Sequence, residues 1–239
     1  VVATIGGSQC GHWLVTSPGF GLSNLYRDEP GTTPTPEAAL DCFKERGRAS
    51  TGVNTMARLP IQNPQSATGS NKEIFDFLQK NLGIVPNMTK VMGNSPAVLQ
   101  AFAQFNGAMG NAKLSAKARE SIALLTAEHN ACTYCLSAHT ALGKMAGLTQ
   151  EQMNGARHGE SGDPKTLAAL TFAQAVLDSR GGVSEQSIAD ARRSGLGEAE
   201  LAEVVGAVAL NVFTNYFNRA FAVDVDFPRV EAHNHAAAR

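Results

Sequence analysis

The sequence carries little charge and no excess of either sign. Charged residues make up 17% of the 239, and the formal net charge is −1. This balance does not predict a broad basic surface, so we expect no nucleic-acid partner. Long apolar runs are missing as well. No stretch approaches the roughly 18 consecutive apolar residues that a membrane-spanning helix needs, so we expect no membrane span and no membrane partner.

Cysteine is scarce, and its spacing does not indicate a disulfide-rich scaffold. The chain has four cysteines, of which Cys132 and Cys135 form a single C-x-x-C pair. Small secreted domains that depend on structural disulfides carry more cysteines at regular spacings. One reactive pair in a reducing compartment explains the pattern better, so we expect a cytoplasmic protein. Nucleotide and haem motifs are also missing, and no G-x-G-x-x-G follows a predicted strand, so we predict no bound cofactor.

The first 55 residues differ from the rest of the chain. They contain Gly-Gly and Pro-Gly pairs and the run Thr32–Pro36, with little helical or strand periodicity between them. Met56 then opens a segment that reads like a native start. Our hypothesis is that residues 1–55 are an over-extended gene start or a disordered leader, and the alternative is a genuine extension. Residues 56–239 would then form the folded domain.

From about residue 70 the pattern is helical throughout. Apolar residues recur at helical spacing, glycines close the segments, and no alternating run has the punctuation of a hairpin. We therefore predict an all-α, single-domain bundle of about eight helices with no significant sheet. The expected helix starts carry capping residues: Ser70, Ser95, Ser115, Thr149 and Asp163.

The stretch from Glu120 to His139 holds the residues with the most chemistry. If the chain is helical from about residue 131, Cys135 and His139 stand at i and i+4 on one face, with Cys132 one turn back. A cysteine in the first turn of a helix is favoured as the thiolate. An imidazole can take the thiol proton, and a carboxylate can hold the imidazole. Glu120, which we expect in the first turn of the preceding helix, is the candidate carboxylate.

The spacing Glu-x11-Cys-x2-Cys-x3-His resembles the core signature of the alkylhydroperoxidase D (AhpD)-like branch of the carboxymuconolactone decarboxylase superfamily. The segment from His139 to Gly147 fits the same pattern. The resemblance covers about residues 71–226, with a motif core at 114–147. It implies an AhpD-like helical fold and subunits that assemble as trimers or hexamers, so we expect a homo-oligomer.

The resemblance also implies an activity, the thiol-dependent reduction of a small hydroperoxide in antioxidant defence. Cys135 would be the peroxidatic thiolate, and Cys132 would resolve its sulfenic acid as a disulfide. Glu120 and His139 would carry the proton. A dithiol compound or a protein reductant would then restore both thiols.

The sequence departs from the best-characterised members at one position. Tyr134 precedes the second cysteine where those members have a histidine. Tyr134 is then either a packing residue or a phenol in the proton relay. Glu128 and His129, just before the motif, are further candidates for the relay. Their alternative roles are those of ordinary surface or helix-terminal residues.

Other interpretations of the cysteine pair remain open. Cys132, Cys135 and His139 are possible zinc ligands, with His129 or His158 as the fourth, but no second knuckle exists and we predict no metal. A thioredoxin-type oxidoreductase would need a strand before the motif. A redox adaptor or sensor would exchange disulfides without consuming peroxide. A lyase of the carboxymuconolactone decarboxylase type would use acid–base residues and would not need both cysteines.

Three asparagines, Asn211, Asn215 and Asn218, lie on one stripe of the last predicted helix among apolar residues. We favour polar contacts at a helix or subunit interface for this stripe. The alternative is a polar lining of the substrate pocket.

Overall fold

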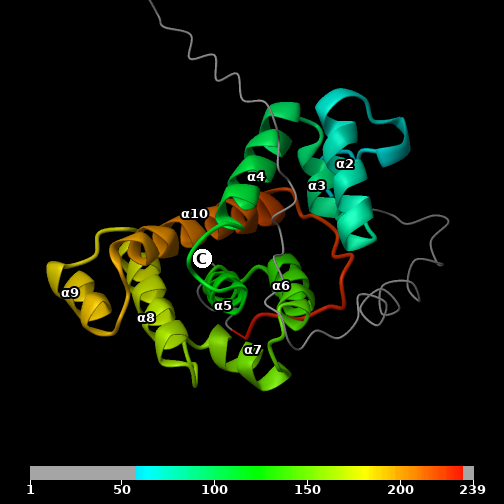
Figure 1. Ribbon diagram of the computed structural model, residues 1–239. Coiled ribbons are helices and arrows are strands. Elements are labelled where there is room, and N and C mark those ends of the chain that lie inside the picture. The colour runs from blue at the N-terminus through cyan, green and yellow to red at the C-terminus, as the bar shows by residue number, and fades with distance from the viewer. Residues whose placement is uncertain (1–56, 234–239) are drawn as a thin grey trace, which may run out of the picture.

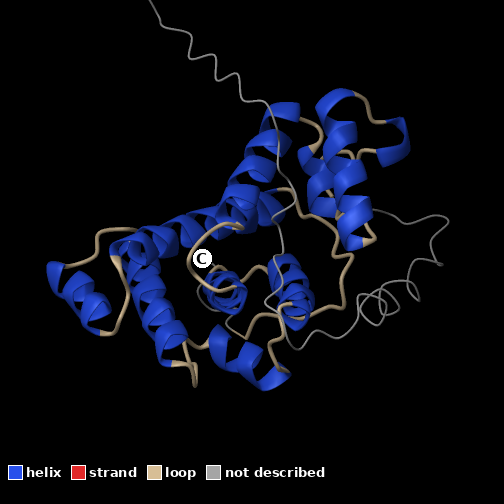
Figure 2. Cartoon of the chain, in the orientation of Figure 1, coloured by secondary structure: helices blue, strands red, loops and turns tan. Residues whose placement is uncertain are grey.

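The computed structural model describes residues 57–233, and these residues form helices and loops without any strand (Figure 2). This confirms the predicted all-α, single-domain architecture. The hypothesis about residues 1–55, together with Cys10 and Cys42, falls outside the described residues. Within these described residues, nine α-helices follow a short 3-10 turn, η2 (Pro64–Ser66), in this order: α2 (Gly69–Leu82), α3 (Asn87–Met92), α4 (Pro96–Met109), α5 (Ala116–His129), α6 (Thr133–Met145), α7 (Gln150–Arg157), α8 (Pro164–Ser179), α9 (Glu185–Arg193) and α10 (Glu198–Ala220).

Local capping fixes most of the helix starts. The side chain of Ser115 accepts the N–H of Ala118 at the start of α5, and Thr149 forms a reciprocal capping box with Gln152 at the start of α7. The predicted start at Ser70 is wrong. α2 begins at Gly69 with Thr68 as its N-cap, because the main-chain bond from Lys72 N to Thr68 O already closes the first turn.

α5 is the central helix of the molecule. It contacts α6, α7, α8 and α10, which surround it in Figure 1. Accordingly its residues are buried on nearly every side from Ser121 to Glu128, and Ile122, Leu124 and Ala127 have no exposed surface. A helix that is covered all round holds its side chains in fixed positions. This rigidity matters because Glu120 belongs to α5 and the turn to the cysteine pair starts at the end of α5.

A second cluster of apolar residues joins α2, α3 and α4, with Phe75, Met92 and Leu99 fully or almost fully buried. Phe217 of α10 contacts both clusters, so the two pack as one body. α10 is the longest of the described helices, with 23 residues. None of the helices in residues 57–233 combines the length and the apolar character needed to cross a bilayer.

The segment after α10 runs back along α6 (Figure 1, red) and is tied to it by hydrogen bonds. Val230 N donates to Ser137 Oγ over 2.9 Å, and Thr133 Oγ1 lies 2.9 Å from Glu231 Oε2. The C-terminal segment therefore covers the start of α6, where the cysteine pair lies.

Candidate active site

A tight turn between α5 and α6 places the cysteine pair at a helix N-terminus. The N–H groups of Ala131 and Cys132 bond back to Glu128 O and Ala127 O, the pattern of a Schellman motif. Ala131 takes the left-handed conformation, with φ 49°, which strains a residue that has a Cβ. α5 therefore stops abruptly, and Cys132 becomes the N-cap of α6.

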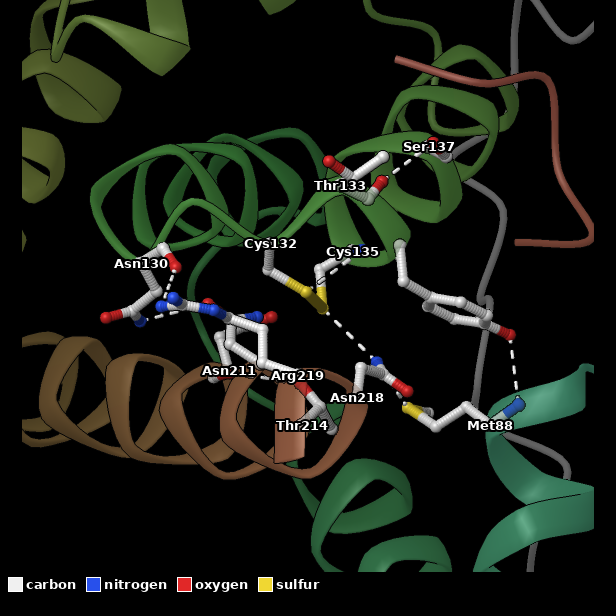
Figure 3. Close-up of a disulfide and its surroundings, with 12 residues drawn as sticks. Met88, Asn130, Cys132, Thr133, Cys135, Ser137, Asn211, Thr214, Asn218 and Arg219 are labelled. Carbon is white, nitrogen blue, oxygen red and sulfur yellow. Dashed lines mark hydrogen bonds between the residues drawn. A yellow bond between two sulfur atoms is a disulfide. The ribbon is translucent and has the colours of Figure 1, made fainter. Parts of the chain in front are cut away.

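The two cysteines occupy different positions at this terminus. Cys132 Sγ accepts the N–H of Cys135 over 3.3 Å, so the Cys132 sulfur serves as the cap. Cys135 is the third residue of α6. The two sulfurs are joined as a disulfide (Figure 3). Both side chains are buried, with 1% of Cys132 and 2% of Cys135 exposed.

Cys135 lines a cavity of about 170 Å³ together with His139 and Glu120. Of the two described cysteines, only Cys135 belongs to its wall. The rest of the wall is largely apolar and comes from several helices and the C-terminal segment, including Leu78, Phe102, Met109, Ala207, Leu210 and Phe227. A molecule in this cavity would therefore meet the Cys135 sulfur in apolar surroundings.

His139 and Glu120 form a hydrogen-bonded pair in this cavity. His139 Nδ1 lies 2.9 Å from Glu120 Oε2, and the side chains are 20% and 14% exposed. Because the carboxylate holds Nδ1, the other ring nitrogen, Nε2, is the one left for proton exchange. Glu120 is in the second turn of α5, not the first as predicted, because the helix begins at Ala116. It contacts His139 across the α5–α6 interface.

Asn218 of α10 contacts the cysteine pair, although it is not part of the motif. Its Nδ2 lies 3.3 Å from Cys135 Sγ and 3.2 Å from Met88 Sδ. Of the other asparagines on the stripe, Asn211 also lines the cavity, whereas Asn215 accepts a hydrogen bond from Asn130 between α5 and α10. Asn215 therefore fits the interpretation of a polar contact between helices. Asn211 and Asn218 fit the interpretation of a polar cavity lining. The sequence signal for Asn218 was its polar side chain on an apolar helix face.

Tyr134 also lines the cavity, but its phenol is engaged elsewhere. The hydroxyl donates to Asp226 Oδ1 over 2.9 Å and accepts the N–H of Met88 over 3.1 Å. Burial raises the pKa of Tyr134 well above its ordinary value, and the nearby Asp226 carboxylate adds to the rise. Burial likewise raises the pKa of Asp226, although the Asn87 N–H opposes the change. The phenol therefore stays protonated at neutral pH and connects α6 to the C-terminal segment.

Glu128 and His129 lie on another side of α5 and do not line the Cys135 cavity. Glu128 Oε2 forms a buried ion pair with Arg157 Nη2 over 2.6 Å, and its Oε1 accepts the N–H of His233. His129 Nδ1 faces Asp178 at 3.8 Å. Both residues line a separate open groove on the surface.

The two histidines considered as a fourth zinc ligand have partners elsewhere in the fold. His158 stacks on the ring of His233, and His129 faces Asp178, so neither lies with the cysteine pair. Within residues 57–233 there is no group of three or more His, Cys, Asp or Glu side chains that could hold a metal ion.

Known proteins share this fold and part of this sequence. Residues 96–175 match the model of the carboxymuconolactone decarboxylase family. No curated protein matches the chain significantly. Among solved structures, an uncharacterized peroxidase-related protein from Silicibacter sp. TM1040 is 22% identical with a TM-score of 0.64, covering 81% of this chain and 100% of its own. An AhpD-core, peroxidase-related protein from Ralstonia eutropha JMP134 is 19% identical with a TM-score of 0.66, covering 72% and 94%. The debrominase Bmp8 is 22% identical with a TM-score of 0.60, covering 70% and 91%.

The fold is a helical bundle that carries a C-x-x-C pair and, in the cavity lined by Cys135, a bonded histidine and glutamate. The matched segment, residues 96–175, contains all four residues of that motif. This segment is therefore similar to the carboxymuconolactone decarboxylase family, and the described part of the chain shares its fold with AhpD-like, peroxidase-related proteins.

Proposed function

We propose that the protein is a thiol-dependent hydroperoxide reductase with Cys135 as its reactive residue. The observation that carries this proposal is the sharing of one cavity by Cys135 and the His139–Glu120 pair. A thiol, its base and the group that orients the base are the parts that an activated sulfur nucleophile requires. Cys132, bonded to Cys135 and outside the cavity wall, has the position of the resolving cysteine.

The reaction begins from the reduced pair. The Cys135 thiolate attacks the terminal oxygen of a hydroperoxide, so an S–O bond forms while the O–O bond breaks. The leaving alkoxide takes a proton and departs as the alcohol, and Cys135 becomes a sulfenic acid. The Cys132 sulfur then attacks the Cys135 sulfur, the disulfide forms, and the hydroxyl leaves with a proton as water. A dithiol donor returns two electrons and two protons.

His139 handles the protons in this scheme. Its Nε2 takes the proton of the Cys135 thiol and returns one to the alkoxide, while Glu120 on Nδ1 stabilises the imidazolium. The pair is only partly exposed, which limits exchange with bulk water during the step.

The cavity favours an organic hydroperoxide over hydrogen peroxide. An apolar protein cavity of about 150 Å³ is known to hold one benzene ring, and the cavity here is of about 170 Å³. An alkyl or arylalkyl group of that size would fill it, whereas hydrogen peroxide would leave most of the apolar wall unoccupied. We therefore propose a substrate such as cumene hydroperoxide as the working probe.

The burial of the disulfide constrains the reductant. Because almost none of either sulfur is exposed, a reductant has to enter through the cavity and meet Cys135. We propose a small dithiol, or a flexible dithiol group carried by a protein partner.

We further propose that the protein associates with copies of itself through α10. Val205, Phe213 and Tyr216 lie on one face of this helix and are 44%, 37% and 58% exposed. Exposed apolar side chains that gather on one helix face are typical of a subunit contact.

Stopped-flow measurement of peroxide consumption by the reduced protein tests the proposal. We expect rapid loss of one equivalent of cumene hydroperoxide with formation of the Cys132–Cys135 disulfide. Cys135→Ser should abolish the reaction, whereas Cys10→Ser and Cys42→Ser should leave it unchanged. An equal loss of activity for Cys10→Ser would refute the assignment. Disulfide exchange with no peroxide consumption would instead establish a redox adaptor, and lactone decarboxylation that survives in Cys135→Ser would establish a lyase.

A second candidate activity is reductive dehalogenation. A cysteine-to-alanine variant of the debrominase Bmp8 binds 2,3,4-tribromopyrrole in a structure that shares this fold, with 20% identity and a TM-score of 0.60. The apolar cavity of the present protein also has the size of a small ring. In such a reaction the dithiol would become a disulfide while a C–Br bond is replaced by C–H and bromide leaves. Release of bromide from tribromopyrrole, measured beside peroxide consumption, distinguishes the two activities.

A further inference from the structure

Asn218 holds its carboxamide against two sulfur atoms in the interior of the protein. Only 3% of this residue is exposed. Its Nδ2 lies 3.3 Å from Cys135 Sγ and 3.2 Å from Met88 Sδ, and Figure 3 shows the side chain reaching from α10 toward the disulfide. The contact joins residues 83 positions apart in the sequence, so the fold alone creates it.

The two sulfurs determine which edge of the amide faces them. The thioether of Met88 has no hydrogen to donate, so the amide edge beside it must be the donating NH₂ group. Turning the amide over would set Oδ1 against the lone pairs of Met88 Sδ. The Cys135 sulfur therefore accepts a hydrogen bond from the amide. Such a donor favours the disulfide and the thiolate, the two forms of the sulfur that carry no hydrogen.

The other end of the amide indicates that packing does not explain the residue. Oδ1 is buried and has no hydrogen-bond partner within residues 57–233. Burying an unpaired acceptor is unfavourable, and an apolar side chain of the same size would avoid this penalty. The contacts of its N–H groups with the two sulfurs therefore explain the asparagine better than packing does.

The helix terminus leaves Cys135 in need of such a donor. The backbone N–H of Cys135 donates to Cys132 Sγ. This N–H in the first turn of α6 therefore stabilises the sulfur of Cys132 and not that of Cys135. The titratable or charged residues around the cavity are Arg119 and Glu120 on α5 and Tyr134 and His139 on α6. α2, α4 and α10 contribute apolar and uncharged polar side chains to the cavity wall.

We propose that Asn218 is a further catalytic residue, whose N–H stabilises the thiolate of Cys135 with Met88 fixing the direction of the amide. The assignment rests on the proposed function, in which Cys135 reacts as the thiolate. When the thiol ionises, its proton leaves to His139, and the N–H of Asn218 remains bonded to the sulfur that now carries the charge. No electron is transferred in this step. Hydrogen bonds to charged groups are stronger than those to neutral ones, which gives the contact its effect on the thiol–thiolate equilibrium.

The test measures the ionisation of Cys135 without any peroxide. Combining Cys10→Ser, Cys42→Ser and Cys132→Ser leaves Cys135 as the sole thiol, and the hydroxyl introduced at position 132 retains a capping oxygen. The rate of alkylation by iodoacetamide as a function of pH then gives the pKa of Cys135. Asn218→Leu should raise this pKa by about one to two units, and Asn218→Asp should raise it further because a carboxylate would face the thiolate.

Asn211→Leu is the matched control. Asn211 also lies on α10 and lines the same cavity, but its Nδ2 donates to Ala207 O within its own helix. The pKa of Cys135 should therefore stay unchanged in this variant. An unchanged pKa in Asn218→Leu, or equal shifts in the two leucine variants, would overturn the proposal. If Asn218→Leu does not fold, Asn218→Ala gives the same comparison with a smaller side chain.

The result also separates this proposal from the proposed activity. If Asn218→Leu shifts the pKa of Cys135 but the protein consumes no hydroperoxide, the reductase activity is refuted. The contact of Asn218 with the thiolate then remains established. If the protein consumes peroxide rapidly but the pKa of Cys135 is the same in Asn218→Leu as in the wild type, only the role of Asn218 is refuted.

Discussion

Breaking the Glu128–Arg157 ion pair should destabilise the protein without impairing its chemistry. The two groups lie 2.6 Å apart, and their side chains are 5% and 6% exposed. Glu128→Gln keeps the shape of the residue but leaves the Arg157 guanidinium buried without its counter-charge. Removing one partner of a buried pair typically costs about 3–5 kcal/mol. That is a large share of the roughly 5–15 kcal/mol that keeps a typical domain folded.

Urea unfolding measures this effect. With a slope of about 1–3 kcal/mol per molar urea, the midpoint should fall by at least about 1 M. Asp76→Asn is the control, since the Lys72–Asp76 pair is 55% and 61% exposed, and exposed pairs of this kind contribute less than about 1 kcal/mol. Replacing both partners, as Glu128→Leu with Arg157→Met, should recover much of the loss, because neither charge then remains buried alone.

The same variant decides between two roles for Glu128. Peroxide consumption per folded molecule of Glu128→Gln should equal that of the wild type, since Glu128 does not line the Cys135 cavity. Unchanged stability combined with a marked loss of turnover would refute our reasoning and make Glu128 a member of the proton relay.

Two further predictions concern pH and assembly. Burial raises the pKa of Asp226 in the folded state, so this carboxyl contributes stability below about pH 4 that is lost as pH rises through the folded value. The unfolding free energy of Asp226→Asn relative to wild type should thus increase as pH rises above about 4. That of Asp163→Asn should instead decrease as pH rises toward about 4, because the Thr166 hydroxyl and N–H lower the pKa of Asp163. Parallel curves for the two variants would contradict this. Tyr216→Glu should lower the mass measured by light scattering if α10 joins the subunits, and an unchanged oligomer would exclude this face.

The sequence was informative wherever the deciding interactions are local. The caps at Ser115 and Thr149 act within three residues, and the structure forms both as predicted. The failure at Ser70 is also instructive, because a capping pattern does not show whether the chain has already turned helical before it. Cys135 and His139 share a helix, so their i, i+4 spacing was enough to place them on one face.

The sequence by itself thus determined the helical class, most of the helix starts and the order of acid, sulfurs and imidazole. Tertiary packing decided which of these groups share a cavity. It brought Asn218 to Cys135 across 83 positions, Asp226 to Tyr134 across 92, and Arg157 to Glu128 across 29. Such contacts depend on how helices cross and on where the chain returns after α10, and no local preference encodes either. For that reason the motif identified the reacting sulfur, but only the fold could show what surrounds it.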